Sequence, residues 1–172
     1  MSEAELNYDH QVVIGIGSNI SPRENMRSSV YLLSRLVLIK DLSSIWKTAA
    51  VGSPGPDFLN AAVLVSTNFP LIQLRNDILR PIENLLGRVR TLDPNAPRTM
   101  DLDPLIFDGN QLDEQIWHYA HMAVPVAEIL PGFIDPQSGK RADLIADELL
   151  KSSRIIKTEL NFHWAGATRD IV

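Results

Sequence analysis

The stretch VVIGIGSNISPRENMRSSVYLLSRL, residues 12–36, contains the first two elements of the fold. Its first six residues, 12–17, form a short apolar run that is typical of a buried strand. Residues 18–19 turn the chain, and residues 21–24 (SPRE) combine a capping box with proline at the first helical position. Apolar residues then recur at helical spacing, so we expect a helix over about residues 22–36.

Later segments continue the alternation of strands and helices. The expected elements are a strand at about residues 42–48, a loop at 51–56, a strand at 61–65, a helix from Pro70 to Gly87 with a kink at Pro81, a strand at 99–107 and a last helix near 142–152. This order predicts an α+β ferredoxin-like sandwich, with helices packed on an antiparallel sheet and additions at the C-terminus. We expect a single domain over residues 1–172, with a core at about 12–135 and a C-terminal helix and tail at about 136–172.

The composition is that of an ordinary globular domain. The chain has 172 residues, 45% of them hydrophobic and 22% charged, and it contains no cysteine, which excludes disulfides and thiolate chemistry. Sixteen basic against twenty-one acidic residues give a formal net charge of -5, which argues against a nucleic-acid partner. No apolar run reaches the length of a membrane span, and the start MSEAE carries acid where a signal peptide carries base. We therefore expect a cytoplasmic protein with no nucleic-acid and no membrane partner.

The triplet Asp101-Leu102-Asp103 is the most informative polar feature. Alternate residues of a strand share one face at a separation of about 6.5–7 Å, so both carboxylates point the same way. Such a pair requires a cation between its members, or one carboxylate must keep its proton. Oxygen ligands without nearby histidine or cysteine favour Mg²⁺, which in proteins usually also binds substrate phosphates. The alternative is a solvated strand edge that carries two unrelated acids.

Three arginines, Arg88, Arg90 and Arg98, lie just before this triplet in an otherwise acidic chain. The planar guanidinium matches pairs of phosphate oxygens and keeps its charge at neutral pH. The two clusters together suit a polyphosphate–magnesium substrate. The alternative is surface arginines that pair with local acids such as Asp93.

Other candidate residues give weaker signals. The segment 15–19 (GIGSN) lacks the third glycine and the lysine of nucleotide-binding loops, so its glycines indicate a tight turn or close packing. Phe58 and Asn60 could stack on and hydrogen-bond a flat heterocycle, although Phe58 also suits the core. His118 and His121 lack the spacing of a zinc site.

The sequence resembles the 6-hydroxymethyl-7,8-dihydropterin pyrophosphokinase family over residues 12 to about 109, and more loosely over 125–131. The segments that carry the resemblance occur in family order, and the Pro-Arg-x-x-Asp-x-Asp block is the most specific of them. They are residues 17–19 (GSN), 42–48 (LSSIWKT), 51–52 (VG), 57–62 (DFLNAA), 82–83 (IE), 86–90 (LGRVR) and 97–103 (PRTMDLD).

The resemblance implies transfer of pyrophosphate from ATP to the hydroxymethyl group of the pterin, with release of AMP, in folate biosynthesis. Asp101 and Asp103 would hold two Mg²⁺ ions and act in catalysis together with Arg88 and Arg98. The implied ATP-binding residues are Glu83, Arg88, Arg90, Arg98 and His118. The implied pterin-binding residues are Thr48, Val51, Phe58, Asn60 and Asp101. The expected partners are ATP and hydroxymethyl dihydropterin, and the expected state is a monomer or a weak homodimer.

The chain departs from the family pattern chiefly in the half of the site expected to hold the pterin. The family has a phenylalanine that stacks on the pterin after its proline–histidine pair, and here the corresponding segment 118–125 (HYAHMAVP) is several residues shorter. We expect Tyr119, His121 or Met122 to take its place. Two alternatives therefore remain open: a diverged paralogue that binds ATP–magnesium with another acceptor or without turnover, and a non-enzymatic ferredoxin-like binding module.

Overall fold

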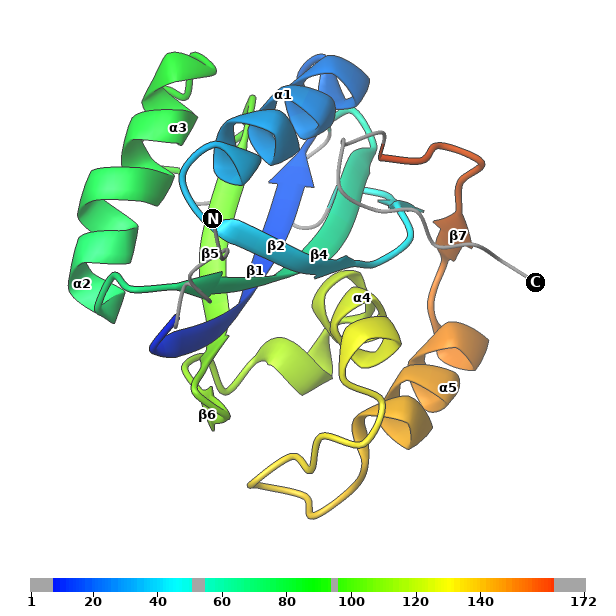
Figure 1. The fold of residues 1–172 in the computed structure, drawn as a ribbon. Helices are drawn as coiled ribbons and strands as arrows, with labels where there is room; N and C mark the ends of the chain where they lie inside the picture. The colour runs from blue at the N-terminus through cyan, green and yellow to red at the C-terminus, as the bar shows by residue number, and fades with distance from the viewer. Residues whose placement is uncertain (1–7, 51–54, 94–95, 163–172) are drawn as a thin grey trace.

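The computed structural model describes residues 8–50, 55–93 and 96–162, and these residues form an antiparallel sheet of seven strands (Figure 1). The strand order is β6-β5-β1-β4-β3-β7, and β2 also pairs with β4. The strands are β1 (His10–Ser18), β2 (Leu38–Leu42), β3 (Trp46–Thr48), β4 (Phe58–Thr67), β5 (Asp101–Phe107), β6 (Asn110–Gln111) and β7 (Ile155–Lys157). The expected α+β class and the antiparallel sheet are confirmed. No helix within the described residues is long and apolar enough to cross a membrane.

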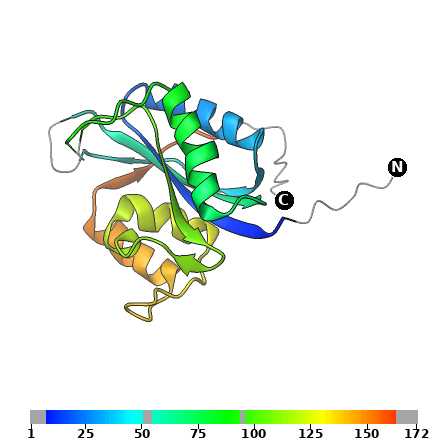
Figure 2. The same cartoon turned by 90° about the vertical axis from the view of Figure 1, so that its left-hand side faces the viewer.

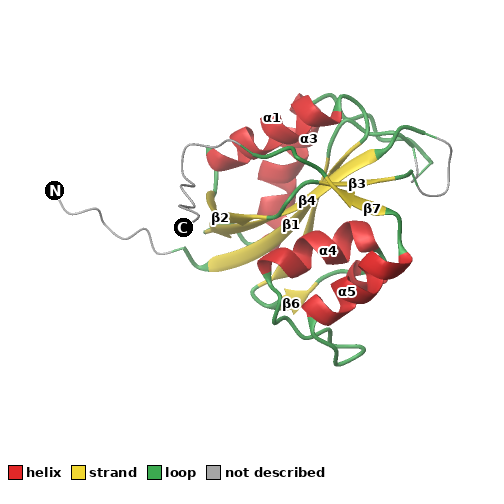
Figure 3. Ribbon diagram, turned by 90° about the vertical axis from the view of Figure 1, so that its right-hand side faces the viewer, coloured by secondary structure: helices red, strands yellow, loops and turns green. Residues whose placement is uncertain are grey.

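Helices cover both faces of the sheet, as the two side views show (Figures 2 and 3). One face packs against α1 (Pro22–Ser34) and the helical run Leu71–Leu85, and the other packs against α4 (Ala120–Ile129) and α5 (Ala142–Ser152). Because β1 is apolar on both sides, Ile14 enters the first core and Val13 the second. The second helical layer thus combines α4, which lies within the expected core, with α5 from the C-terminal additions, and the last strand, β7, extends the sheet beside β3.

Pro81 lies inside the second helical run, which comprises α2 (Leu71–Gln73), a π-helical segment (Leu74–Leu79) and α3 (Arg80–Leu85). In the π segment the Arg80 N–H donates to the carbonyl of Arg75, five residues back. Proline is tolerated in the first turn of a helix, and Pro81 occupies that position in α3. The irregularity expected at Pro81 is therefore a widened turn before the proline, which lets the chain continue as a helix.

Two local expectations from the sequence are wrong. The strand expected at 42–48 is two strands, β2 and β3, because Ser43 interrupts the ladder: its hydroxyl oxygen accepts the Ala62 N–H at 2.8 Å. The capping box is also absent, since Ser21 has a φ of +43° and its side chain makes no capping hydrogen bond. In that left-handed conformation the side chain does not reach the amides of the first helical turn.

Strand β5 contains Pro104, which has no N–H to donate to a ladder. The register against β1 shifts at this point, because Ile14 pairs with Pro104 whereas Val13 pairs with Ile106. The bulge leaves Leu105 as the extra residue on β5. The half of β5 that carries the two aspartates therefore keeps regular pairing, with Asp101 opposite Gly17 and Asp103 opposite Gly15.

Candidate active site

The carboxylates of Asp101 and Asp103 lie on the sheet face that α4 covers in part. Leu102, between them, points to the opposite face and is buried in the core under α1 and α3. On neighbouring strands, Gly17 pairs with both Asp101 and Asn60. The glycine therefore leaves open space between an acidic and an amide side chain. A pocket of about 90 Å³ forms here, lined by Gly15, Gly17, Asn60, Asp101, Asp103, Leu105, His121, Met122 and the strand residues beside them.

Close packing requires glycine at position 15, whereas the missing side chain of Gly17 keeps the space beside Asn60 open. A Cβ on Gly15 would lie 3.0 Å from Leu105 Cδ1, and a Cβ on Gly17 would lie 3.4 Å from Asn60 Oδ1. Both glycines lie within β1. Of the two roles expected from the sequence, close packing is confirmed and a tight turn at these glycines is wrong.

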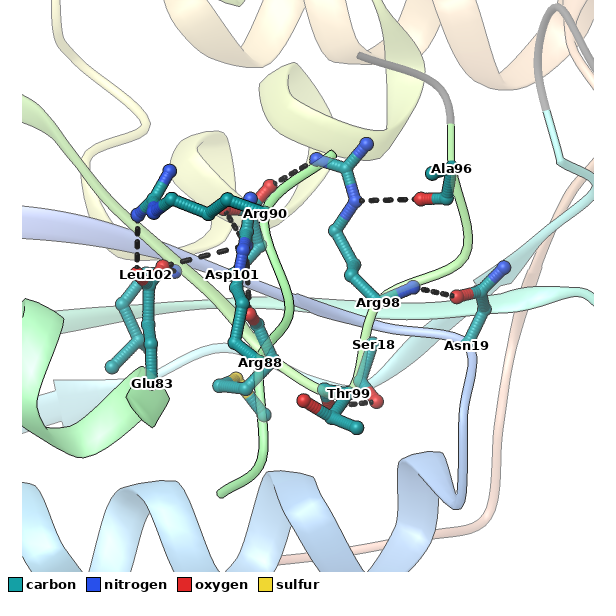
Figure 4. A network of polar contacts seen from close by, with 11 residues as sticks. Ser18, Asn19, Glu83, Arg88, Arg90, Ala96, Arg98, Thr99, Asp101 and Leu102 are labelled. Carbon is teal, nitrogen blue, oxygen red and sulfur yellow. Dashed lines mark hydrogen bonds and ion pairs between the residues drawn. The ribbon is translucent and has the colours of Figure 1, made fainter. Parts of the chain in front are cut away.

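Two arginines hold the Asp101 carboxylate from opposite sides (Figure 4). Arg88 Nη1 donates to Asp101 Oδ1, and Arg98 Nη1 donates to Asp101 Oδ2 at 2.6 Å. Arg88 Nη1 also donates to the Met100 carbonyl at 2.7 Å, and only 10% of the Arg88 side chain is exposed. Arg88 is therefore held firmly against the first residue of β5.

Glu83 anchors the same network from α3. Its side chain is 3% exposed, it accepts the Leu102 N–H at 2.9 Å, and it pairs with Arg88 at 3.4 Å and with Arg90 at 2.6 Å (Figure 4). Burial raises the pKa of Glu83, against the opposing effect of the Leu102 N–H and the two arginines. The resemblance implies that Glu83 lies near the nucleotide; in the structure Glu83 pairs with Arg88 and Arg90 and thereby sets their position.

A second pocket, of about 310 Å³, lies on the arginine side of the carboxylates. Its lining includes Arg88, Arg90 and Arg98 together with Asp101 and Asp103. The two aspartates therefore border both pockets, one rich in arginine and the other floored by glycine.

The pKa of Asp103 is raised to about 6, first by exclusion of bulk water and then by repulsion from Asp101 and Glu83. Its surface remains open to the pockets, but surrounding protein atoms replace most of its solvent. Arg88 and Arg98 bond Asp101, whereas Asp103 has only a weaker attraction to Arg88 and Arg75. The pair therefore has a deficit of positive charge at Asp103.

Three of the residues expected to hold the pterin, Thr48, Phe58 and Asn60, lie on the neighbouring strands β3 and β4. Asn60 Nδ2 donates to Thr48 Oγ1 at 2.9 Å, which fixes the amide with its oxygen toward Gly17. The Arg98 guanidinium lies 5.8 Å from the centre of the Phe58 ring, so Phe58 borders the arginine as well as the expected heterocycle site. Val51 lies outside the described residues.

The structure places His121, rather than His118, beside the carboxylates. His118 ends the 3-10 helix Ile116–His118 and lines a separate pocket with Asp135 and Lys140. The next residue, Tyr119, is extended, and this turns the chain so that His121 and Met122 line the pocket of Asp101. Tyr119 is not among the lining residues, but its ring lies 5.6 Å from that of His121. Burial, and secondarily Arg98, lower the pKa of His121.

Ser18 and Asn19 hydrogen-bond the backbone of Thr99 and Arg98, a role that the sequence did not reveal. Ser18 Oγ donates to the Thr99 carbonyl at 2.5 Å, and Asn19 Oδ1 accepts the Arg98 N–H at 2.7 Å (Figure 4). The GSN sequence at the end of β1 was visible in the sequence. Its role was not, because the residues that Ser18 and Asn19 contact lie about 80 positions further along the chain.

The donor set fits a hard cation bound together with a phosphorylated ligand. Among the described residues no cluster of three or more acidic or histidine side chains could hold a metal ion by itself. Mg²⁺ typically uses one or two carboxylates and takes its other ligands from water and substrate phosphates. Asp101 and Asp103, facing the arginine-lined pocket, match that pattern.

Fold and site together define a class: an α+β protein with a carboxylate–arginine site suited to phosphorylated ligands. The chain belongs to the 7,8-dihydro-6-hydroxymethylpterin-pyrophosphokinase family, whose model matches residues 13–131.

Named relatives and a solved structure agree with this assignment. The chain is 32% identical over 142 residues to the 2-amino-4-hydroxy-6-hydroxymethyldihydropteridine pyrophosphokinase of Synechocystis, covering 76% of this chain and 72% of the relative. It is 34% identical over 128 residues to the enzyme of that name from Bacillus subtilis, covering 67% and 75%. The structure also matches Plasmodium falciparum HPPK-DHPS with pteroate at a TM-score of 0.63 and 10% identity, covering 83% of this chain and 44% of that longer chain. This last likeness concerns the fold alone.

Proposed function

We propose that the protein transfers pyrophosphate from ATP to the hydroxymethyl group of 6-hydroxymethyl-7,8-dihydropterin and releases AMP, a step of folate biosynthesis. The observation that carries this proposal is that two pockets share Asp101 and Asp103. The arginine-lined pocket suits the ATP phosphates, and the glycine-floored pocket suits a flat heterocycle. The hydroxymethyl group would then lie at the junction, next to the phosphorus it attacks.

The reaction forms one bond and breaks one. The pterin hydroxyl oxygen bonds to the β-phosphorus of ATP, the bond from that phosphorus to the oxygen bridging to the α-phosphorus breaks, and AMP leaves with that oxygen. The hydroxyl proton is lost as the new bond forms. Such transfer depends mainly on positioning and on stabilising the phosphate charge, so arginines and carboxylates suffice as the chain's contribution.

Asp101 and Asp103 are the residues that would hold two Mg²⁺ ions with ATP. When bound, the ions neutralise phosphate charge and orient the transferred group. Without ligand, the guanidinium groups of Arg88 and Arg98 occupy both oxygens of Asp101. We expect the Arg98 Nη1 to exchange Asp101 for phosphate oxygens as ATP binds, while the Arg98 Nε, which donates to the Ala96 carbonyl at 3.4 Å, keeps its place. Arg88, bonded to Glu83 and Met100 as well, would stay in place.

The pterin would lie on the floor made by Gly15 and Gly17, with Asn60 at its edge. A heterocycle in such a pocket needs its faces covered and its polar edge hydrogen-bonded. Phe58, beside Arg98, can cover one side, and His121 on α4 can cover the other. Tyr119 would then support the His121 ring from behind.

Release of AMP from ATP, measured with and without the hydroxymethyl pterin, tests the proposal against its alternatives. Pterin-dependent AMP release supports the pyrophosphokinase. Magnesium-dependent ATP binding without turnover would instead indicate a paralogue with another acceptor or with none. A protein that binds no nucleotide would be a binding module and would overturn the proposal.

A further inference from the structure

Asn19 lies where three parts of the candidate site meet. It follows β1 directly, precedes α1, and is only 3% exposed although its side chain is polar. A buried amide normally has all its hydrogen-bonding groups engaged, so the partners of Asn19 show what it holds.

The first partner is the backbone of Arg98, with which Asn19 acts both as hydrogen-bond acceptor and as donor. Asn19 Oδ1 accepts the Arg98 N–H at 2.7 Å, and the Asn19 N–H donates to the Arg98 carbonyl at 3.1 Å. The Ile20 N–H donates to the same carbonyl at 3.3 Å. The root of the Arg98 side chain is thereby fixed to the end of β1.

The second partner is the segment that leads into β4. Asn19 Nδ2 donates to the Pro56 carbonyl at 3.3 Å, two residues before Phe58. Arg98 and Phe58 meet again through their side chains, with the guanidinium 5.8 Å from the ring centre. One amide side chain therefore joins the segment with the phosphate-side arginine to the segment with the heterocycle-side aromatic.

We propose that Asn19 is a positioning residue that couples the two halves of the site, so that a nucleotide on the arginine side strengthens binding on the aromatic side. This coupling rests on the proposed function. The mechanism is geometric: Asn19 holds the Arg98 backbone and the Pro56 carbonyl in one arrangement, so a nucleotide that engages the Arg98 guanidinium also orders the segment that carries Phe58. Loss of the amide leaves each pocket with its own lining but removes the link between them.

The link can be tested first without any ligand, by amide hydrogen exchange followed by NMR. Asn19→Ala removes the acceptor of the Arg98 N–H, so the Arg98 amide should exchange at least about tenfold faster, the effect of losing about 1.4 kcal/mol of protection. Asn19→Asp keeps an oxygen acceptor for Arg98 but loses the donor to Pro56, so it should leave that amide protected. Asn25→Ala is the matched control, because Asn25 Nδ2 donates only to the nearby Ile20 carbonyl at 2.7 Å. Unchanged exchange at Arg98 in Asn19→Ala would overturn the proposal.

The coupling is then measured by calorimetric titration of the pterin with and without a non-hydrolysable ATP analogue and Mg²⁺. The ratio of the two affinities should exceed about fivefold in the wild-type protein and fall at least about threefold in both Asn19 variants. If the affinity ratio falls in Asn19→Asp while the Arg98 amide stays protected, the loss of coupling is not caused by a loosened Arg98 backbone, and this result would support the proposal. A wild-type ratio of one, or an unchanged ratio in Asn19→Ala, would overturn the proposal. If the wild-type protein binds neither ligand, the proposed function fails and this coupling fails with it, while the exchange result still decides whether Asn19 holds Arg98.

Discussion

Asp103 and Asp101 are close in sequence but differ in their surroundings. Asp101 is bonded by two arginines, whereas Asp103 is repelled by the carboxylates of Asp101 and Glu83. A cation beside Asp103 would relieve that repulsion. The negative charge of the pair that is least neutralised by arginine is therefore that of Asp103.

Asp103→Asn should lower the rate of AMP formation about 100- to 1,000-fold, because an amide cannot supply the negative charge that holds the cation on the phosphates. Steady-state assays at rising Mg²⁺ concentration measure the loss. Asp113→Asn, on the surface near β6, is a control that should keep full activity. Wild-type turnover in Asp103→Asn at saturating Mg²⁺ would refute the role of Asp103.

The same substitution should have an opposite effect on stability. Asp103 titrates at about 6 in the folded state against an ordinary value of 3.8, so the folded state keeps a proton that the unfolded state has lost between these values. This stabilising contribution is complete below about pH 3.8 and is lost as pH rises to about 6. In metal-free buffer, the free energy of unfolding of Asp103→Asn minus that of the wild type should therefore increase from pH 4 to pH 7. Urea unfolding at several pH values measures it, and a difference that falls over this range would contradict the assignment.

His121→Ala should weaken pterin binding about two- to tenfold, the range expected for loss of one stacking contact. His121→Phe should restore most of the affinity, since it keeps a ring. Calorimetric titration with the ATP analogue present measures both. His118→Ala is the control, because His118 lines a different pocket. A larger loss of pterin affinity in His118→Ala than in His121→Ala would contradict this assignment and indicate that His118 contacts the ligand.

At the scale of elements, β1 is the floor of one pocket because its glycines have no side chains. Gly17→Val should reduce pterin affinity at least about tenfold, since the added side chain would fill the space next to Asn60, while ATP affinity should change little. Gly132→Val is the control and should leave pterin affinity unchanged, because a Cβ at Gly132 would have no neighbour within 4 Å. Calorimetric titration with each ligand compares the variants. Equal pterin affinity in Gly17→Val and wild type would place the pterin elsewhere.

The segment from the end of α3 to β5 carries three arginines with unequal roles. Arg98→Ala should slow transfer about 100- to 1,000-fold with a smaller effect on ATP binding, if its contact forms as phosphate charge develops. Arg90 is 59% exposed, and its guanidinium pairs with Glu83, so Arg90→Ala should slow transfer less than about tenfold. Rapid-quench measurements of the chemical step compare the two, and a slower step in Arg90→Ala than in Arg98→Ala would reverse the ranking.

The sequence predicted most elements because their signals are local. The apolar run of β1, the helical spacing of α1 and the last helix over residues 142–152 need no distant partner to be recognised. The break at Ser43 could not be predicted, because it depends on the backbone of Ala62 on another strand. Strand β7 was missed for a similar reason: three residues become a strand only because β3 offers them an unpaired edge.

The parts of the candidate site that lie on a single strand could be predicted from the sequence. The parts that depend on the packing of several elements could not. Alternation on β5 placed both aspartates on one face, and the structure agrees. The positions of Glu83, His121 and Asn19 depend on how α3, α4 and the end of β1 pack, which no short pattern encodes. His121 was one of three residues expected beside the pterin, and it lines the pocket of Asp101. His118 was expected beside the nucleotide and lines another pocket, because the turn at Tyr119 depends on the packing of α4 against the sheet.

At the scale of the whole molecule, the sheet brings together residues that are far apart in the chain. The row Asp101, Gly17, Asn60 and Trp46 crosses β5, β1, β4 and β3, and β7 extends it with Lys157. The layer of α4 and α5 covers part of this face (Figure 3), and Asp101 lines a pocket on the same face. The uncovered part of the face is where the two pockets meet.

The central claim is that these two pockets serve one transfer between ATP and a pterin. Phosphorus NMR of a reaction containing ATP, Mg²⁺ and 6-hydroxymethyl-7,8-dihydropterin tests it most directly, with the Asp101→Asn/Asp103→Asn double variant as control. We expect AMP and a pterin diphosphate in equal amounts from the wild-type protein and neither from the variant. Formation of ADP and a pterin monophosphate, or AMP without a phosphorylated pterin, would contradict it.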